Sequence, residues 1–170
     1  MPTYTFTEDD SRRAFDEWGC NCGPTALAFA LQASLDYVRP LIPGFDQKRY
    51  TSPSMMKAAL EAANAYWTPA HRPSVEAMFD QHDIQGRLAL VRVQWTGPWT
   101  QPGANPKWAY WHTHWITTWT ERGVPLLFDV NGGMRGIDSW EGEIVPVLTA
   151  QTPRADGGWF PTHIWRLNRR

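Results

Sequence analysis

The chain has 170 residues and a formal net charge of -1, because 17 acidic residues nearly balance 16 basic ones. This length suits a single domain, residues 1–170, that buries its core without metals or disulfides. The balanced charge gives no electrostatic footprint for nucleic acid or an anionic membrane, and we expect neither as a partner.

The N-terminal residues do not predict secretion. They lack the basic-then-apolar order of a signal peptide, and no apolar run approaches the roughly 20 residues that span a bilayer. We therefore expect a protein that is cytoplasmic, or delivered from the cytoplasm. Cys20 and Cys22 lie too close in sequence to pair without severe strain, so two free thiols are expected there.

The first half of the chain shows helical patterns. WGCNCGPTALAFAL, residues 18–31, leads into an apolar stretch that predicts a largely buried helix extending to about Tyr37. Thr51 or Ser52 as N-cap, followed by proline, predicts a second helix in TSPSMMKAALEAANA. A shorter third helix is expected in RPSVEAMFDQHD, residues 72–83.

The second half shows strand patterns. The Gly- and Pro-rich segment 96–107 is expected to be a surface loop, and TERGV, residues 120–124, is expected to connect a hairpin. Helices followed by strands predict an α+β fold with helices packed on an antiparallel sheet. The expected strands are 87–95, 108–119, 124–130, about 143–148 and 159–167.

Cys22 is a candidate nucleophile because it stands where the first helix begins. A helix N-terminus and a neighbouring imidazolium are two ways to lower the pKa of a thiol, and Cys22 has the first. Gly23 allows another part of the backbone to approach closely, and Pro24 fits the first helical turn. Unpaired N–H groups at the same helix start can hold an oxyanion. Cys20 lacks this position.

A base for such a thiol is expected in WAYWHTHWITTW, residues 108–119, which places His112 and His114 on one face of a strand. The base must be held in one tautomer by a third group. The hairpin brings LLFDVNGG to the neighbouring strand, with Asp129 near the start of the histidine strand and Asn131 two residues further on.

Three motifs in chain order, CNCGPTALAFAL, HWITTW and FDVNGG, resemble the papain-like cysteine peptidase superfamily. The resemblance is to its bacterial branch, which includes the double-glycine leader peptidase domains of bacteriocin exporters. It implies a papain-like fold, Cys22 as nucleophile, His114 as general base and then acid, and Asp129 as the group that orients His114.

The chain departs from this family at the oxyanion hole. The family usually has Gln six residues before the nucleophile, whereas this sequence has Asp16, followed by Glu17. A carboxylate would repel an oxyanion, so another donor is required, such as the backbone N–H of Cys22.

We therefore expect a thiol hydrolase that cleaves an amide or peptide bond of a peptide or protein substrate through a thioester, without a cofactor or metal. Deamidation or acyl transfer would share the first half-reaction. Two alternatives lie outside this chemistry, namely a catalytically inactive module with a Trp-rich binding surface and a zinc site. The four candidate zinc ligands are Cys20, Cys22, His112 and His114.

The sequence leaves three roles open for His112. It is expected to be a partner of the base, a substrate contact, or the base itself. Most of the eleven tryptophans are expected in the core. Trp99, Trp108 and Trp111 are candidates for a substrate rim, and Trp140 for shielding the His–Asp pair from water.

Overall fold

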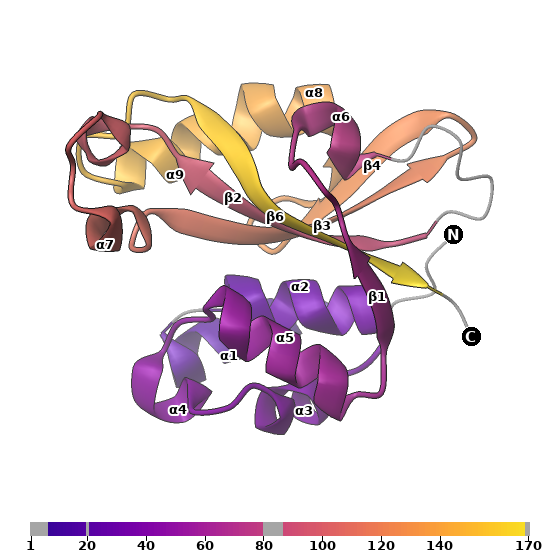
Figure 1. Ribbon diagram of the computed structural model, residues 1–170. Helices are drawn as coiled ribbons and strands as arrows, with labels where there is room; N and C mark the ends of the chain where they lie inside the picture. The colour runs from indigo at the N-terminus through magenta and orange to yellow at the C-terminus, as the bar shows by residue number, and fades with distance from the viewer. Residues whose placement is uncertain (1–6, 20, 80–86, 169–170) are drawn as a thin grey trace.

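A computed structural model describes residues 7–19, 21–79 and 87–168 of the chain. Six antiparallel strands form one sheet in the order β1-β6-β2-β3-β4-β5, with helices on both of its faces (Figure 1). The architecture is therefore α+β, as the sequence predicts. The strands are β1 (Tyr66–Pro69), β2 (Ala89–Trp95), β3 (Thr113–Glu121), β4 (Val124–Asp129), β5 (Gly133–Gly136) and β6 (Trp159–Asn168).

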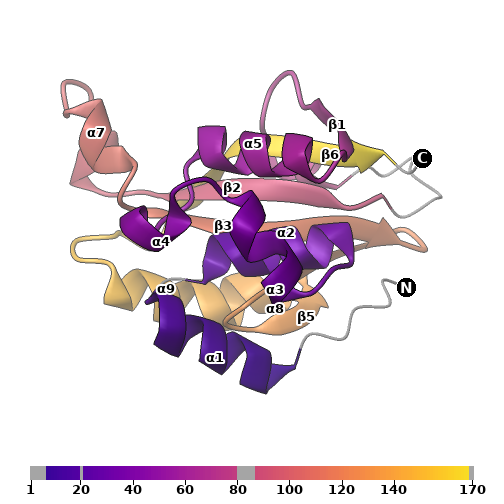
Figure 2. The same cartoon turned by 90° about the horizontal axis from the view of Figure 1, so that it is seen from below.

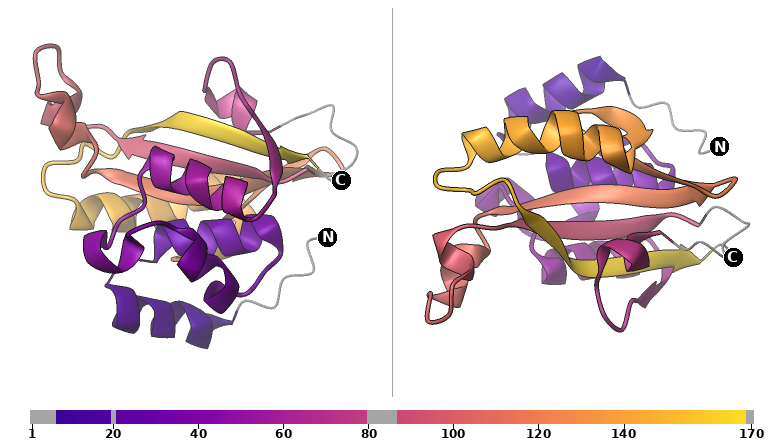
Figure 3. Two further views of the ribbon diagram at one scale, coloured as in Figure 1. Left: turned by 60° about the horizontal axis from the view of Figure 1, so that its bottom comes forward. Right: turned by 90° about the horizontal axis from the view of Figure 1, so that it is seen from above.

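One face of the sheet carries the N-terminal helices, which Figure 2 shows from below. The opposite face carries the short helix α6 and the C-terminal helices, which the right-hand view of Figure 3 shows from above. The N-terminal layer comprises α1 (Glu8–Trp18), α2 (Cys22–Leu31), α3 (Leu35–Val38), η1 (Arg39–Leu41), α4 (Phe45–Lys48) and α5 (Pro53–Ala62). The opposite layer comprises α6 (Val75–Met78), α8 (Ile137–Ser139), the π-helix η3 (Trp140–Ile144) and α9 (Val145–Gln151). Between β2 and β3 lie η2 (Pro98–Thr100) and α7 (Pro106–Ala109), and α7 projects from one end of the sheet.

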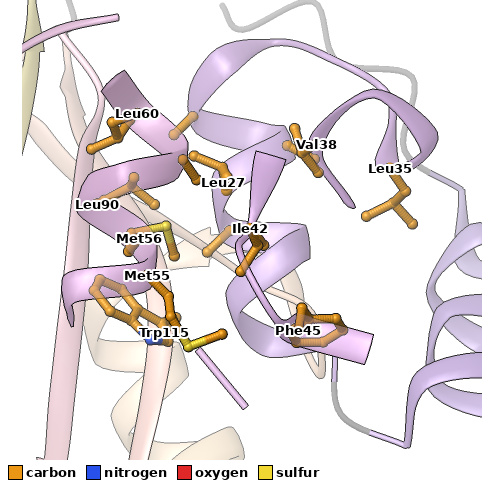
Figure 4. Close-up of a cluster of buried hydrophobic side chains, with 14 of the residues drawn as sticks. Leu27, Leu35, Val38, Ile42, Phe45, Met55, Met56, Leu60, Leu90 and Trp115 are labelled. Atoms are coloured by element: carbon orange, nitrogen blue, oxygen red, sulfur yellow. The ribbon is translucent and has the colours of Figure 1, made fainter. Parts of the chain in front are cut away.

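The two faces of β3 serve different cores. Trp115 belongs to the cluster under the N-terminal helices, where Figure 4 shows it beside Met55. Thr117 donates its hydroxyl hydrogen to the carbonyl of Ala26 over 2.8 Å, which fixes α2 along the strand. Ile116, between them, belongs to the cluster under the C-terminal helices. The strict alternation of a strand thus decides which side chains meet α2.

The predicted first helix is shorter than expected. It ends at Leu31 because Gln32 adopts a left-handed conformation with φ 54°, and Ser34 then caps the separate helix α3. Ser52 accepts from the backbone N–H of Met55 and caps α5, as predicted. The predicted third helix is confirmed over Val75–Met78, and residues 80–83 of that prediction lie outside the described part.

Several strand predictions need correction. The prediction of a strand from 108 is wrong at its start, because Asn105 caps α7 and β3 begins only at Thr113. The strand expected at 143–148 is helical, since Pro146 stands in the first turn of α9, where its missing N–H costs nothing. The hairpin is confirmed, with Arg122 and Gly123 both at positive φ. Helix α1 and strands β1 and β5 were not predicted.

Among the described residues, no helix has both the length and the apolar character required to cross a membrane.

Candidate functional site

Cys22 is the first residue of α2, as the sequence predicts. The preceding Asn21 does not cap the helix with its side chain, because its amide donates to the carbonyl of Ser11 over 3.1 Å. Gly23 lies so close to Thr51 that an added Cβ would overlap that side chain. Trp115 donates its indole N–H to the carbonyl of Thr51 over 2.8 Å and so fixes this crossing. The tight crossing explains the glycine that follows Cys22.

His114 and Asp129 form a buried pair. The Nε2 atom of His114 lies 3.0 Å from Oδ2 of Asp129, an ion-pair distance, although the N–H is not aligned with that oxygen. His114 is 7% exposed and Asp129 is completely buried. The hairpin brings the two residues together. Thr117 of β3 pairs with Phe128 of β4, so Asp129, which follows Phe128, lies beside the start of β3. The predicted proximity of these two residues is confirmed.

Three N–H groups fix the carboxylate of Asp129. Its Oδ1 accepts from the backbone and side-chain amides of Asn131, over 2.8 and 3.1 Å, which closes the turn after β4. Its Oδ2 accepts from the indole of Trp140 over 2.7 Å. Burial by itself raises the pKa of Asp129, but the charge of His114 and these hydrogen bonds outweigh it, so the pKa is lowered. The carboxylate of Asp129 therefore favours its ionised form.

Aromatic rings enclose the pair on the side of the C-terminal helices. Trp95 stacks on the ring of His114 at a centroid distance of 6.2 Å and on Trp140 at 6.3 Å. Trp159 meets Trp140 edge to face at 5.1 Å. Trp140 is completely buried, so it shields the pair from water rather than lining an open rim.

Cys22 and His114 belong to opposite layers. Cys22 packs against the cluster that contains Trp115, whereas the contacts of His114 are with Asp129 and Trp95 on the other face of β3. The ladder between β3 and β4 covers Thr117–Glu121 and stops short of His114. His114 therefore stands on a part of β3 that is not paired with β4.

His112 has a separate setting. Its ring stacks on Trp99 at a centroid distance of 3.5 Å, and burial lowers its pKa. Its carbonyl accepts from the backbone N–H of Trp95 and the side chain of Gln94. The pairing with Asp129 therefore belongs to His114, and the structure gives His112 a packing role.

The other predicted residues lie as follows. Trp99 is buried and donates to the carbonyl of Trp95 over 2.7 Å, so it is a core residue rather than a rim residue. Trp108 and Trp111, in and after α7, are 54% and 77% exposed. Asp16 and Glu17 are exposed in the last turn of α1, where Glu17 lies 3.5 Å from a guanidinium nitrogen of Arg39.

Sequence reasoning missed Arg92, a buried cation in the centre of β2. It is 4% exposed in a strand whose residues are all buried. It pairs in register with Trp115 and with His163, so its side chain points toward the layer of α2. The signal available in the sequence was a lone arginine in the otherwise apolar run ALVRV.

The three candidate zinc ligands within the described residues do not support a zinc site. His112 stacks on Trp99 and His114 faces Asp129, while Cys20 lies outside the described residues. Within residues 7–19, 21–79 and 87–168, no group of three or more His, Cys, Asp or Glu side chains is arranged to hold a metal ion.

A groove of about 660 Å³ reaches the residues that flank the site. Asn21, directly before Cys22, lines one end, and Asn131, which holds Asp129, lines another part. The stacked rings of Phe29 and Phe128, 4.3 Å apart, form its buried floor. The remaining lining residues come from α1 and from the turn around β5: Thr7, Ser11, Arg12, Phe15, Val130, Gly132, Gly133, Met134 and Arg135.

The fold and site define an α+β protein with a cysteine at the start of a buried helix and a buried His–Asp pair in the adjacent sheet. No model of a known protein family matches the sequence, and no curated protein matches it either.

Proposed function

We propose that this chain is a papain-like thiol hydrolase that cleaves an amide bond in a peptide or protein. The observation that carries the proposal is the buried His114–Asp129 pair, whose carboxylate is fixed by Asn131 and Trp140 at the edge of the strand next to α2. A completely buried carboxylate 3.0 Å from an imidazole nitrogen is the arrangement that orients a catalytic base. In this proposal Cys22, at the start of α2, is the nucleophile that His114 would serve.

The reaction would proceed in two halves. The sulfur of Cys22 attacks the carbonyl carbon of the scissile amide, and His114 gives its proton to the leaving amine as the C–N bond breaks. The acyl group is then held as a thioester on Cys22. Water attacks this thioester, His114 takes the proton of the water, and the carboxylic acid leaves as the thiolate is restored. The reaction needs no oxidant and no metal.

The first turn of α2 would supply the donors for the oxyanion. The side chain of Asn21 is engaged with Ser11 and leaves the first turn of the helix uncapped. Backbone N–H groups at this end of a helix point outward and carry a partial positive charge. This assignment replaces the role that glutamine has in the related family, since Asp16 cannot donate a hydrogen bond when ionised.

The groove suggests how a peptide would reach the site. Its floor is apolar at Phe29 and Phe128, and its edges carry polar groups such as Asn21 and Asn131. An extended peptide fits this combination because its side chains can cover the rings while its backbone bonds to the polar edges. We infer that residues on one side of the scissile bond lie here.

The test is a turnover assay with a peptide and glutamine substrate panel, combined with intact-mass measurement after an electrophilic probe. Cys22→Ala should abolish both turnover and labelling, and His114→Ala should lower turnover by about 10²-fold or more. Cys20→Ser and His112→Ala are the matched controls and should retain turnover. Full activity in Cys22→Ala or His114→Ala would overturn the proposal, and release of ammonia without chain cleavage would assign a deamidase.

A further inference from the structure

Arg92 carries a positive charge in a place where burial makes a charge costly. It is 4% exposed, and desolvation is the largest effect on its pKa, which is lowered. A guanidinium nevertheless keeps its proton in proteins, so the charge itself remains. A buried cation of this kind is strongly destabilising unless an anion or several hydrogen bonds compensate it.

The neutral contacts of Arg92 compensate it only in part. Its Nη1 donates to the hydroxyl of Thr162 over 3.3 Å, and its guanidinium lies 5.1 Å from the ring centroid of Tyr110. Its Nε is buried and makes no hydrogen bond to the described residues. Among those residues, no carboxylate forms an ion pair with Arg92.

A distortion of the sheet holds the side chain in this place. The pairing of β2 with β6 shifts between Arg92 and Val93, and Thr162 is the extra residue on β6. The hydroxyl of Thr162 donates to the carbonyl of Arg92 over 3.1 Å while it accepts from the guanidinium. Bulges of this kind re-aim side chains and are frequent beside active sites.

The candidate anion is the sulfur of Cys22. Arg92 pairs in register with Trp115, whose indole donates to the carbonyl of Thr51, and Thr51 lies against Gly23, the residue after Cys22. Burial lowers the pKa of Arg92, and Tyr110 and then Cys22 act electrostatically in the opposite direction. Such an interaction is mutual, so the cation favours the thiolate as much as the thiolate favours the cation.

Resting on the proposed function, we propose that Arg92 is the buried counter-charge that holds the sulfur of Cys22 as a thiolate in the resting protein. It is a positioning residue, since it acts through the nucleophile, and it makes the thiolate independent of the protonation of His114. His114 is then left to carry protons to the leaving group and from water. The pair of charges also explains how an arginine is retained at the centre of a buried strand.

Among the described residues, Tyr110 and His163 are titratable groups that stand beside this cation. Tyr110 follows α7 and covers the guanidinium, and His163 on β6 stands beside Arg92 in register. Burial and the charge of Arg92 both lower the pKa of His163, so His163 adds no second positive charge at neutral pH. Asp16 and Glu17, at the end of α1, are exposed to solvent. Arg92 is a buried cation in the layer of α2 that can act on the ionisation of Cys22.

The experiment measures how fast iodoacetamide alkylates Cys22 as a function of pH, in the full chain with Cys20→Ser so that one thiol remains. Arg92→Met and Arg92→Gln should move the midpoint of the profile upward by about one pH unit or more. Arg92→Lys should keep most of the original midpoint because it keeps the charge. Arg166→Met is the matched control, since Arg166 on β6 donates to Ala77 in the opposite layer, and its midpoint should not move.

The result separates this inference from the proposed function. His114→Ala should lose turnover yet keep a low alkylation midpoint, because the counter-charge remains. An unchanged midpoint in both Arg92→Met and Arg92→Gln, with their circular dichroism spectra intact, would overturn the inference and leave the proposed function standing. A midpoint that rises in His114→Ala but not in the Arg92 variants would also overturn it. Loss of the Cys22 requirement for turnover would overturn the proposed function alone.

Discussion

The indole of Trp140 should contribute more to stability than its size alone explains. Its N–H donates to Oδ2 of Asp129 over 2.7 Å, and both residues are completely buried. A hydrogen bond to a charged group is worth about 1.5–3 kcal/mol. Trp140→Phe removes this bond and part of the ring. Trp119→Phe removes the same atoms from a buried indole whose N–H makes no hydrogen bond within the described part of the chain. Trp119→Phe is therefore a matched control for packing.

We expect Trp140→Phe to lose about 1.5–3 kcal/mol more unfolding free energy than Trp119→Phe. Urea unfolding at pH 7 followed by far-ultraviolet circular dichroism measures both, without the fluorescence changes that a lost tryptophan causes. The missing donor should also let the pKa of Asp129 rise, which lowers turnover if this carboxylate orients His114. Equal losses in the two variants would show that the hydrogen bond to the carboxylate adds nothing to stability, and the role of Trp140 in fixing Asp129 would be wrong.

Three further predictions concern the same region. The pKa of Asp129 is lowered in the folded protein, so its ionised form stabilises the fold fully above the ordinary carboxyl pKa of about 4, and this stabilisation is lost as the pH falls further. The free energy of unfolding should therefore decrease less steeply with falling pH in Asp129→Asn than in the unchanged protein. Gly23→Ala should cost about 1–3 kcal/mol through its overlap with Thr51, and the double variant with Thr51→Gly should recover part of that loss in thermal unfolding. Thr117→Val and Thr118→Val should each lower the free energy of unfolding in urea by about 1 kcal/mol, because each loses one buried hydrogen bond. The hydroxyl of Thr117 bonds to Ala26 of α2, whereas that of Thr118 bonds to Met78 of α6, so of these two variants Thr117→Val alone should also slow the alkylation of Cys22.

The parts of the site that the sequence predicted depend on local rules. Cys22 could be placed at a helix start because Gly-Pro and an apolar run follow it directly. Asp129 could be placed near His114 because a two-residue hairpin turn fixes the register of the strands it joins. Such inferences need only the neighbouring residues, and the structure agrees with them.

The parts that were missed depend on contacts between distant segments. The apolar residues within 143–148 fit a strand or a buried helix, and the packing of Val145 in the cluster of Trp140 favours α9, whose first turn accepts Pro146. Arg92 looked like an ordinary strand residue, because its partners Thr162 and Tyr110 come from β6 and from the end of α7. The capping box from Thr7 to Asp10 was a local signal for α1 that the prediction overlooked.

Asp129 shows why a structural and a catalytic interpretation of one residue need not compete. Its Oδ1 closes the turn after β4 through both amides of Asn131, and its Oδ2 receives Trp140 and faces His114. The turn fixes the backbone and the rotamer of the carboxylate, so its second oxygen is already in place when a base has to be oriented. The same turn ends the pairing of β4 with β3 at Phe128 and Thr117, short of His114. Under the proposed function, one aspartate at the end of a strand would therefore close a turn and also set the direction of the base.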